Sequence, residues 1–288
     1  HRAAADNTSR DLFALNRAVR FGMSGTLKKR QDGKQKYLEA VFGPIVFEYS
    51  DQEAEADGRV TPQRVYAVSV PRGPKVADKS QLIQERRGIN ENKVRNQIIR
   101  NIVDLVPPNQ QLILFVRTIQ HIEHLMEMYL PKDFVVYHGE LSDKVRAELE
   151  RGITAGEHKR VIANDALGEG VDTVNLDVII DAAWTVSDIN VSQKGGRNRR
   201  LRDGKPYGVL INFQDEWGEE ARLAAIAEKE AIGLVATESE ERPDPLFNRA
   251  QKRLQQYRDR GWPIEEIDDL REIEFVQQDQ DQAEPPTE

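Results

Sequence analysis

Several features are missing from this sequence of 288 residues, and each absence excludes a class of protein. It contains no cysteine, which rules out disulfides, thiolate zinc sites and cysteine nucleophiles. No run approaches the ~18 consecutive apolar residues of a membrane span, and no charged and then apolar leader opens the chain. We therefore expect a soluble, intracellular protein.

The sequence also lacks the phosphate-binding loop Gly-x-x-x-x-Gly-Lys-Ser/Thr. Gly-Lys occurs at 33–34 and at 204–205, each time without the rest of the pattern. The residues of this sequence are therefore not expected to bind the phosphates of a nucleoside triphosphate through such a loop.

The net charge of -8 is distributed unevenly. Residues 264–288 carry ten Asp or Glu and one Arg, which leaves about +1 for residues 1–263. Local basic clusters in this long first part therefore matter more for partner binding than the overall charge does. The acidity belongs to a tail whose last dozen residues have the composition of a disordered end.

Short apolar runs alternate with longer amphipathic stretches from about Thr61 onward. Strands are expected at RVYAVSV, LILFV, FVVYH, RVIAN, DVIIDA and YGVLINF. Helices are expected at about 79–105, at HIEHLMEMYL, at SDKVRAELERG, near residue 193, from about residue 216 and at about 248–260. Continuous apolar strands alternating with helices are typical of a parallel sheet covered on both faces, so the predicted fold class is α/β, doubly wound.

The densest basic cluster is QKGGRNRRLRDGK, residues 193–205, with six Lys or Arg in thirteen positions. On an α-helix, Gln193, Arg197 and Arg200 would fall within an arc of about 60°, with Gly196 at its edge. Arginine binds phosphate well because its planar guanidinium donates two parallel hydrogen bonds to phosphate oxygens and stays charged. A solvated basic helix and a general nucleic-acid patch remain alternatives.

Two further segments have the composition of ligand-binding turns. VIANDALGEGVDT, from residue 161, runs from an apolar strand into a loop where Gly170 and Asp172 could meet a ligand at the carboxyl end of the sheet. Ser24 and Thr26, in SGT, could relay hydrogen bonds between a nucleotide and a neighbouring domain. Ordinary turns are the alternative for both segments.

Taken in order, these segments resemble the core of a superfamily 2 helicase of the DEAD/DEAH-box-like kind, over residues 1 to about 217. HRAAADNTSR resembles the end of a DEAH-type box, and SGT resembles the third motif. LILFVRTIQHIEHL resembles the fourth motif and YHGELSDKVRAEL the segment after it. ANDALGEGVDT resembles the fifth motif, and QKGGRNRR matches the sixth with Gln193, Gly196, Arg197 and Arg200 in register.

The resemblance implies a role for each matching residue. The residues implied in catalysis on ATP phosphates are Arg197, Arg200 and Gln193. Those implied in ATP binding are Gly170, Asp172, Glu169 and Gly196. Those implied in contacts to nucleic acid or in coupling the lobes are Ser24, Thr26, Arg117, His138 and Asn164. Two positions depart from the family pattern, because Asn164 replaces the usual Thr and Gly25 the usual Ala.

The implied architecture is a RecA-like second helicase lobe at 61–217, preceded by a remnant of the first lobe at 1–60. A helical extension and acidic tail would occupy 218–288. The family's Mg²⁺ ligands would then precede His1, and this fragment alone is expected to be inactive on ATP. HIEH supplies two histidines without a third ligand, so no metal site is expected.

The implied function is that of an ATP-dependent helicase or translocase, on DNA more than RNA, in the cytoplasm or at the nucleoid. Its partners would be nucleic acid and the missing N-terminal lobe, with no membrane. The alternative is a non-catalytic RecA-like module that binds nucleic acid or protein. A sugar-nucleotide enzyme on a similar fold ranks last, because it leaves the register of Gln193, Arg197 and Arg200 unexplained.

Overall fold

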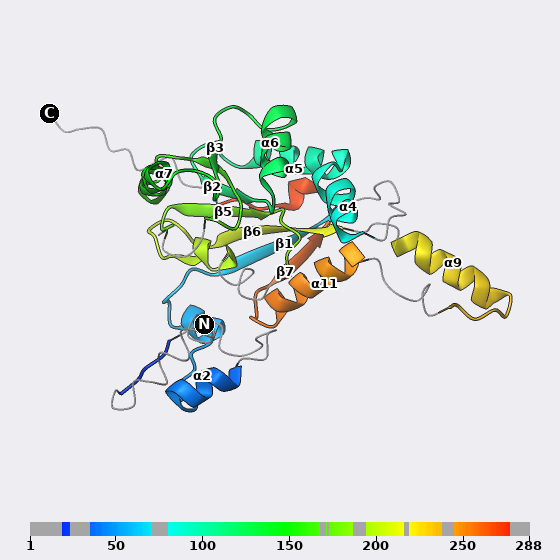
Figure 1. Ribbon diagram of the computed structural model, residues 1–288, viewed down its shortest axis with the longest axis horizontal. Helices are drawn as coiled ribbons and strands as arrows, with labels where there is room; N and C mark the ends of the chain where they lie inside the picture. The colour runs from blue at the N-terminus through cyan, green and yellow to red at the C-terminus, as the bar shows by residue number, and fades with distance from the viewer. Residues whose placement is uncertain are drawn as a thin grey trace.

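The computed structural model describes residues 19–23, 35–70, 80–167, 171, 173–186, 194–215, 219–237 and 245–276. Its centre is a seven-stranded sheet in the order β3-β4-β2-β5-β6-β1-β7 (Figure 1). Every pairing of neighbouring strands is parallel. The strands are β1 Gln63–Val70, β2 Gln111–Phe115, β3 Val135–Tyr137, β4 Arg160–Ala163, β5 Leu176–Asp181, β6 Gly208–Asp215 and β7 Ile264–Ile267. The predicted doubly wound α/β class is confirmed.

The helices of the described residues lie before, between and after these strands. The α-helices are α2 Gln35–Phe42, α3 Asp51–Ala56, α4 Gln81–Glu85, α5 Lys93–Leu105, α6 Ile119–Met128, α7 Asp143–Ala155, α9 Glu219–Ala231 and α11 Pro245–Arg258. A π-helical turn, η2, covers Arg86–Asn90, and 3-10 turns cover η3 Arg197–Arg199 and η4 Leu270–Glu272.

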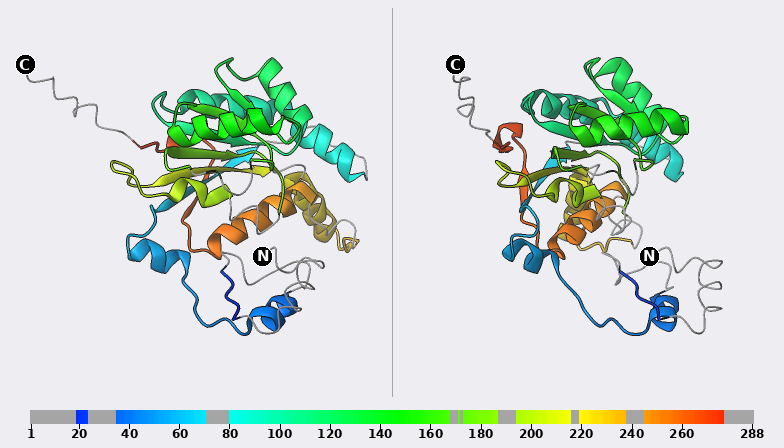
Figure 2. Two further views of the ribbon diagram at one scale, coloured as in Figure 1. Left: turned by 60° about the vertical axis from the view of Figure 1, so that its left-hand side comes forward. Right: turned by 90° about the vertical axis from the view of Figure 1, so that its left-hand side faces the viewer.

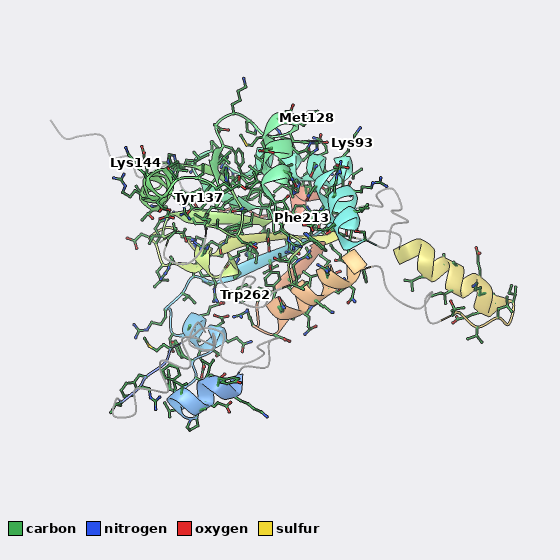
Figure 3. The ribbon with its side chains drawn as sticks, viewed as in Figure 1. Lys93, Met128, Tyr137, Lys144, Phe213 and Trp262 are labelled. Atoms are coloured by element: carbon green, nitrogen blue, oxygen red, sulfur yellow. The ribbon has the colours of Figure 1, made fainter. Side chains whose placement is uncertain are left out.

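The inner strands β2, β4, β5 and β6 are buried along their whole length, which is why their sequences are largely apolar. Successive residues of a strand point to opposite faces, so Leu112 and Leu114 belong to one core and Ile113 and Phe115 to the other. Helices α5 and α6 cover the first face, and α7 and α11 contribute to the second. Figure 2 shows helices on both sides of the sheet. Tyr137, Phe213 and Trp262 are all buried in these cores (Figure 3).

The helix expected over about 79–105 is interrupted in the structure. After α4 the chain widens into the π-helical turn and leaves helical geometry at Asn92, whose φ and ψ are -72° and 102°. The Asn92 side chain accepts a hydrogen bond from the backbone of Arg95 and donates one to Gly88. Asn92 therefore starts α5 as a new helix, because its short amide can cap exposed backbone N–H groups.

The sheet continues beyond residue 217, which is the predicted end of the RecA-like domain. Strand β7 pairs with β1, placing Val65 opposite Ile264, and Leu254 of α11 packs in the second core. Residues 245–276 therefore complete the sheet and its cover and do not form a separate extension.

Candidate functional site

The loop after β4 and the basic turn η3 meet on one side of the sheet. Arg197 donates hydrogen bonds from Nη2 to the carbonyl oxygen of Leu167, 2.9 Å away, and from Nη1 to that of Val171, 3.5 Å away. In return, the Thr173 hydroxyl donates to the Arg197 carbonyl oxygen at 2.9 Å. The segments that resemble the fifth and sixth helicase motifs are therefore in direct contact.

Arg197 is half-buried in this position, and burial lowers the pKa of its guanidinium, with the neighbouring charge of Arg200 acting in the same direction. Arginine stays protonated despite such a shift, because its pKa starts far above neutral pH. Arg197 thus places a permanent positive charge beside the loop.

Arg200 and Gly196 are exposed on either side of Arg197. Lys194 and Gly195 are α-helical, Arg197–Arg199 form a 3-10 turn, and Arg200 already has the extended values φ -65° and ψ 134°. The arc calculated for an α-helix therefore does not describe Arg200. The chain instead leaves the turn toward β6 with Arg200 at the surface.

Most of the other basic residues in the cluster are engaged within the fold. Lys194 Nζ lies 2.7 Å from Asp165 Oδ1, Lys205 donates to the carbonyl of Leu176, and Arg202 pairs with Asp177. These three basic residues are therefore paired within the fold and do not lie on a solvated helix face. Arg197 differs from these residues because its guanidinium donates to two backbone carbonyls of the loop after β4, and Arg200 differs because it is exposed.

Three candidates for nucleic-acid contact follow the carboxyl ends of adjacent strands. Arg117 follows β2, His138 follows β3 and Asn164 follows β4, and these strands are neighbours in the sheet. Because the strands are parallel, the three residues lie along one edge. The structure therefore brings them together, as ligand-binding residues of open α/β sheets are.

The surroundings of these three residues differ. Arg117 is exposed, lies 3.4 Å from a Glu85 carboxylate oxygen and rests 5.0 Å from the Trp184 ring centroid. His138 is half-buried. Asn164 accepts a hydrogen bond on its side-chain oxygen from the backbone of Ala166 at 3.1 Å, which shapes the start of the loop.

Two side chains near this site have no signal in the sequence. Lys194 joins the loop after β4 to the basic turn through Asp165, and Arg249 of α11 lies 4.0 Å from the same Trp184 ring as Arg117. Both depend on segments that are distant in sequence and meet only in the fold. Arg249 adds a second guanidinium beside Arg117.

The remaining predicted site residues lie outside the described residues. They are Gln193, Glu169, Gly170, Asp172, Ser24 and Thr26. Their predicted roles stay predictions.

Within the described part of the chain, no group of three or more His, Asp or Glu side chains could hold a metal ion. We therefore assign no Mg²⁺ ligand among the described residues. A membrane-spanning helix, which would have to be both long and apolar, is likewise not found in the described ranges.

Residues 94–202 match the family described as helicase conserved C-terminal domain. This region is a helicase C-terminal domain. It runs from α5 through the basic turn, and it contains Arg117, His138, Asn164, Arg197 and Arg200. The resemblance found in the sequence is confirmed for this helicase domain.

Curated relatives are similar over the same part of the chain. Eukaryotic initiation factor 4A of Dictyostelium discoideum is 29% identical over 105 residues, which is 36% of this chain and 25% of the relative. An uncharacterized ATP-dependent helicase, YprA of Bacillus subtilis, is 24% identical over 139 residues, covering 48% of this chain and 18% of the relative. The chain thus spans about a quarter or less of the length of these relatives.

Solved structures share the fold of the helicase domain. A fragment of an HsdR subunit of a type I restriction enzyme from Vibrio vulnificus has a TM-score of 0.53 at 17% identity, covering 67% of this chain and 39% of that one. S. cerevisiae Dbp5, as a variant bound to RNA and ADP BeF3, has a TM-score of 0.50 at 14% identity, covering 83% and 49%.

Proposed function

We propose that this chain is the second lobe of an ATP-dependent nucleic-acid helicase or translocase and supplies its arginine fingers. The observation that carries the proposal is the contact of Arg197 with the loop after β4, inside a helicase C-terminal domain. Arg200 follows at the surface on the same basic turn. The whole protein would complete the ATP site with a first lobe.

Arg197 and Arg200 have the chemistry that phosphoryl transfer requires. Negative charge spreads over the phosphoryl oxygens in the transition state, and a guanidinium held close to them stabilises that charge. The loop carbonyls that accept from Arg197 hold its guanidinium beside the loop after β4. Gly170 and Asp172 would contact the sugar of ATP, and Mg²⁺ would be bound by residues of the first lobe.

Arg117, His138 and Asn164 would contact the backbone of the nucleic acid along the carboxyl edge of β2, β3 and β4. Contacts of this kind are to phosphates, so binding should depend weakly on base sequence and strongly on salt. We propose DNA as the substrate, because the DEAH-Arg beginning, the SGT triplet and the long helical region before β2 resemble DNA helicases most. The relatives named above include an RNA-bound protein, so the test includes both nucleic acids.

The test is ATP hydrolysis by the full-length protein, alone and with single-stranded or duplex DNA or RNA. We expect stimulation by DNA, and a fall in kcat of about a thousandfold or more in Arg197→Ala, the range found when arginine fingers are removed. Arg258→Ala is the matched control, since Arg258 is an exposed arginine whose ion pair with Glu266 lies away from the loop. A folded full-length protein without hydrolysis would leave the non-catalytic binding module as the better account.

A further inference from the structure

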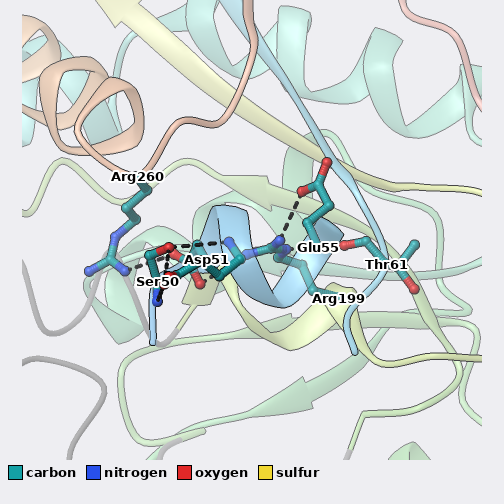
Figure 4. Close-up of polar contacts among 7 residues, drawn as sticks. Ser50, Asp51, Glu55, Thr61, Arg199 and Arg260 are labelled. Atoms are coloured by element: carbon teal, nitrogen blue, oxygen red, sulfur yellow. Dashed lines mark hydrogen bonds and ion pairs between the residues drawn. The ribbon is translucent and has the colours of Figure 1, made fainter. Parts of the chain in front are cut away.

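Arg199, the middle basic residue of the sixth-motif segment, binds a helix that precedes the sheet. Its Nη1 lies 3.1 Å from Asp51 Oδ1 and its Nη2 3.0 Å from Glu55 Oε2, both on α3 (Figure 4). Its Nε donates to the carbonyl oxygen of Thr61 at 3.1 Å. Only 3% of the side chain is exposed. All three guanidinium nitrogens are therefore engaged, and the buried side chain is not accessible to a phosphate in this arrangement.

A second arginine, from the segment between α11 and β7, binds the same Asp51 carboxylate. Arg260 Nη1 lies 3.1 Å from Asp51 Oδ2, so the two guanidiniums approach the two oxygens of one carboxylate (Figure 4). Both guanidiniums also lie over the Trp262 ring, at 5.3 and 5.8 Å from its centroid. A carboxylate shared in this way is held in a fixed position, because each arginine restricts the other's geometry.

The backbone reinforces the side-chain contact at the end of the segment that leads into β1. The Thr61 N–H donates to the Arg199 carbonyl oxygen at 2.9 Å, and the Thr61 hydroxyl donates to that of Arg200 at 3.1 Å. Helix α3 is itself well defined, since Ser50 and Glu53 form a reciprocal capping box at its start. The segment 50–61 therefore contacts the basic turn at its start, through Asp51, and at its end, through Thr61.

Immediately before Ser50, the Tyr49 hydroxyl still donates a hydrogen bond to Asp57 Oδ2 at 2.7 Å, whereas the chain before Tyr49 is irregular and exposed. Residues 45–50 have no regular structure, and the side chains of Val46 and Phe47 are 92% and 75% exposed. Gly43, at the end of α2, has a φ of 82°, a conformation that favours glycine. The segment between α2 and α3 is therefore irregular and exposed, which suits a pivot.

We propose that Arg199 is a positioning residue: it makes α3 part of the second lobe and holds the turn carrying Arg197 and Arg200 against the linker from the first lobe. The proposal rests on the proposed function. When the lobes move, the pivot is in residues 43–48, and the force on the linker reaches the arginine turn through Arg199. The resemblance to helicases assigns no role to this position, which lies between the two matched arginines.

The first test is hydrogen exchange in the 288-residue chain without nucleotide. In Arg199→Gln, we expect the amides of Ala54, Asp57 and Arg59 to exchange roughly tenfold faster or more, because α3 loses its buried partner and opens locally. Asp51→Asn is the milder second variant, since Asp51 is partly exposed and its loss leaves the core intact. Arg258→Gln is the control.

Amides of β2 and β5 report in the same experiment whether the chain remains folded. If they stay protected while α3 loosens in Arg199→Gln or Asp51→Asn, docking of α3 through Arg199 is supported. If α3 exchange is unchanged in a folded variant, the proposal is overturned.

The second test is ATP hydrolysis by the full-length protein. We expect Glu55→Gln to lower kcat by roughly threefold to tenfold with little change in the KM for ATP, the pattern of lost transition-state positioning. Combining Glu55→Gln with Arg199→Gln should cost no more than Arg199→Gln alone, because both remove the same contact. Unchanged kcat in Arg199→Gln with a loosened α3 would overturn the positioning role. No hydrolysis by the unsubstituted protein would overturn the proposed function, and docking would still be decided by hydrogen exchange.

Discussion

His121 is a histidine whose burial should make the stability of the protein depend on pH. Its side chain is 1% exposed, and its Nε2 lies 3.1 Å from Asn96 Oδ1. Burial, followed by the positive charges of Arg95 and His124, lowers the pKa of His121 to about 3, from an ordinary value of 6.5. Between these pH values the unfolded chain binds the extra proton and the folded chain does not, so stability is lost as the pH falls.

We expect the free energy of unfolding to fall by about 1.4 kcal/mol per pH unit from this group between pH 6.5 and 3. Urea unfolding at pH 7 and pH 5 of the unsubstituted chain and of His121→Gln measures the effect. Glutamine can still donate to Asn96 and does not titrate, so the variant should lose less stability on acidification, by about 2 kcal/mol. Equal losses in the two proteins would show that His121 is accessible to protons in the fold.

At the residue scale, the local spacing singles out Arg197 and Arg200, and their reach to phosphate stays a prediction. The sequence does not show which basic residues form ion pairs inside the fold. The ion pairs of Arg199 with Asp51 and of Lys194 with Asp165 join segments far apart in the chain. No local pattern carries that information, because partners of buried charges are chosen by the tertiary structure.

At the scale of elements, the basic turn passes close to the segment that precedes β7, and Gly195 makes this passage possible. A Cβ at position 195 would lie 2.5 Å from Cζ3 of Trp262. We expect Gly195→Ala to lower the free energy of unfolding by about 1–3 kcal/mol, the usual cost of overpacking. Trp262→Phe in the same chain should recover part of that loss.

Urea unfolding of the single and double variants measures this prediction. Gly139→Ala is the control, because a Cβ there meets only the Ala166 side chain at 3.4 Å, an ordinary contact. If Gly195→Ala were as stable as the control, the turn would be able to move away from Trp262 without cost.

Six of the strands could be predicted because each is a continuous apolar run, whereas β7 could not. Its sequence is IEEI, and Glu265 and Glu266 are exposed. An edge strand has one neighbour and is covered less completely, so it needs fewer apolar residues than a central one. The same strand was therefore counted with the acidic tail.

At the scale of the whole molecule, the two cores depend on residues beyond the predicted domain boundary at 217. Leu254, Tyr257 and Trp262 belong to one core, and Ile267 and Ile273 to the other. We expect a chain ending at residue 217 to lose cooperative unfolding, because both faces of the sheet would be exposed, while a chain ending at 276 keeps it. Thermal unfolding followed by circular dichroism, with size-exclusion chromatography, compares the two. Equal midpoints would show that 61–217 is a complete domain.

The strand order also decides when the sheet can form. Strand β1 lies between β6 and β7, so Gln63 pairs with Gly208 and Val65 with Ile264. During synthesis β1 leaves the ribosome long before either neighbour exists, at about 5–20 residues per second. Its run of Val, Tyr and Ala must wait unpaired for many seconds, so we expect β1 to be prone to aggregation and to bind chaperones on the nascent chain.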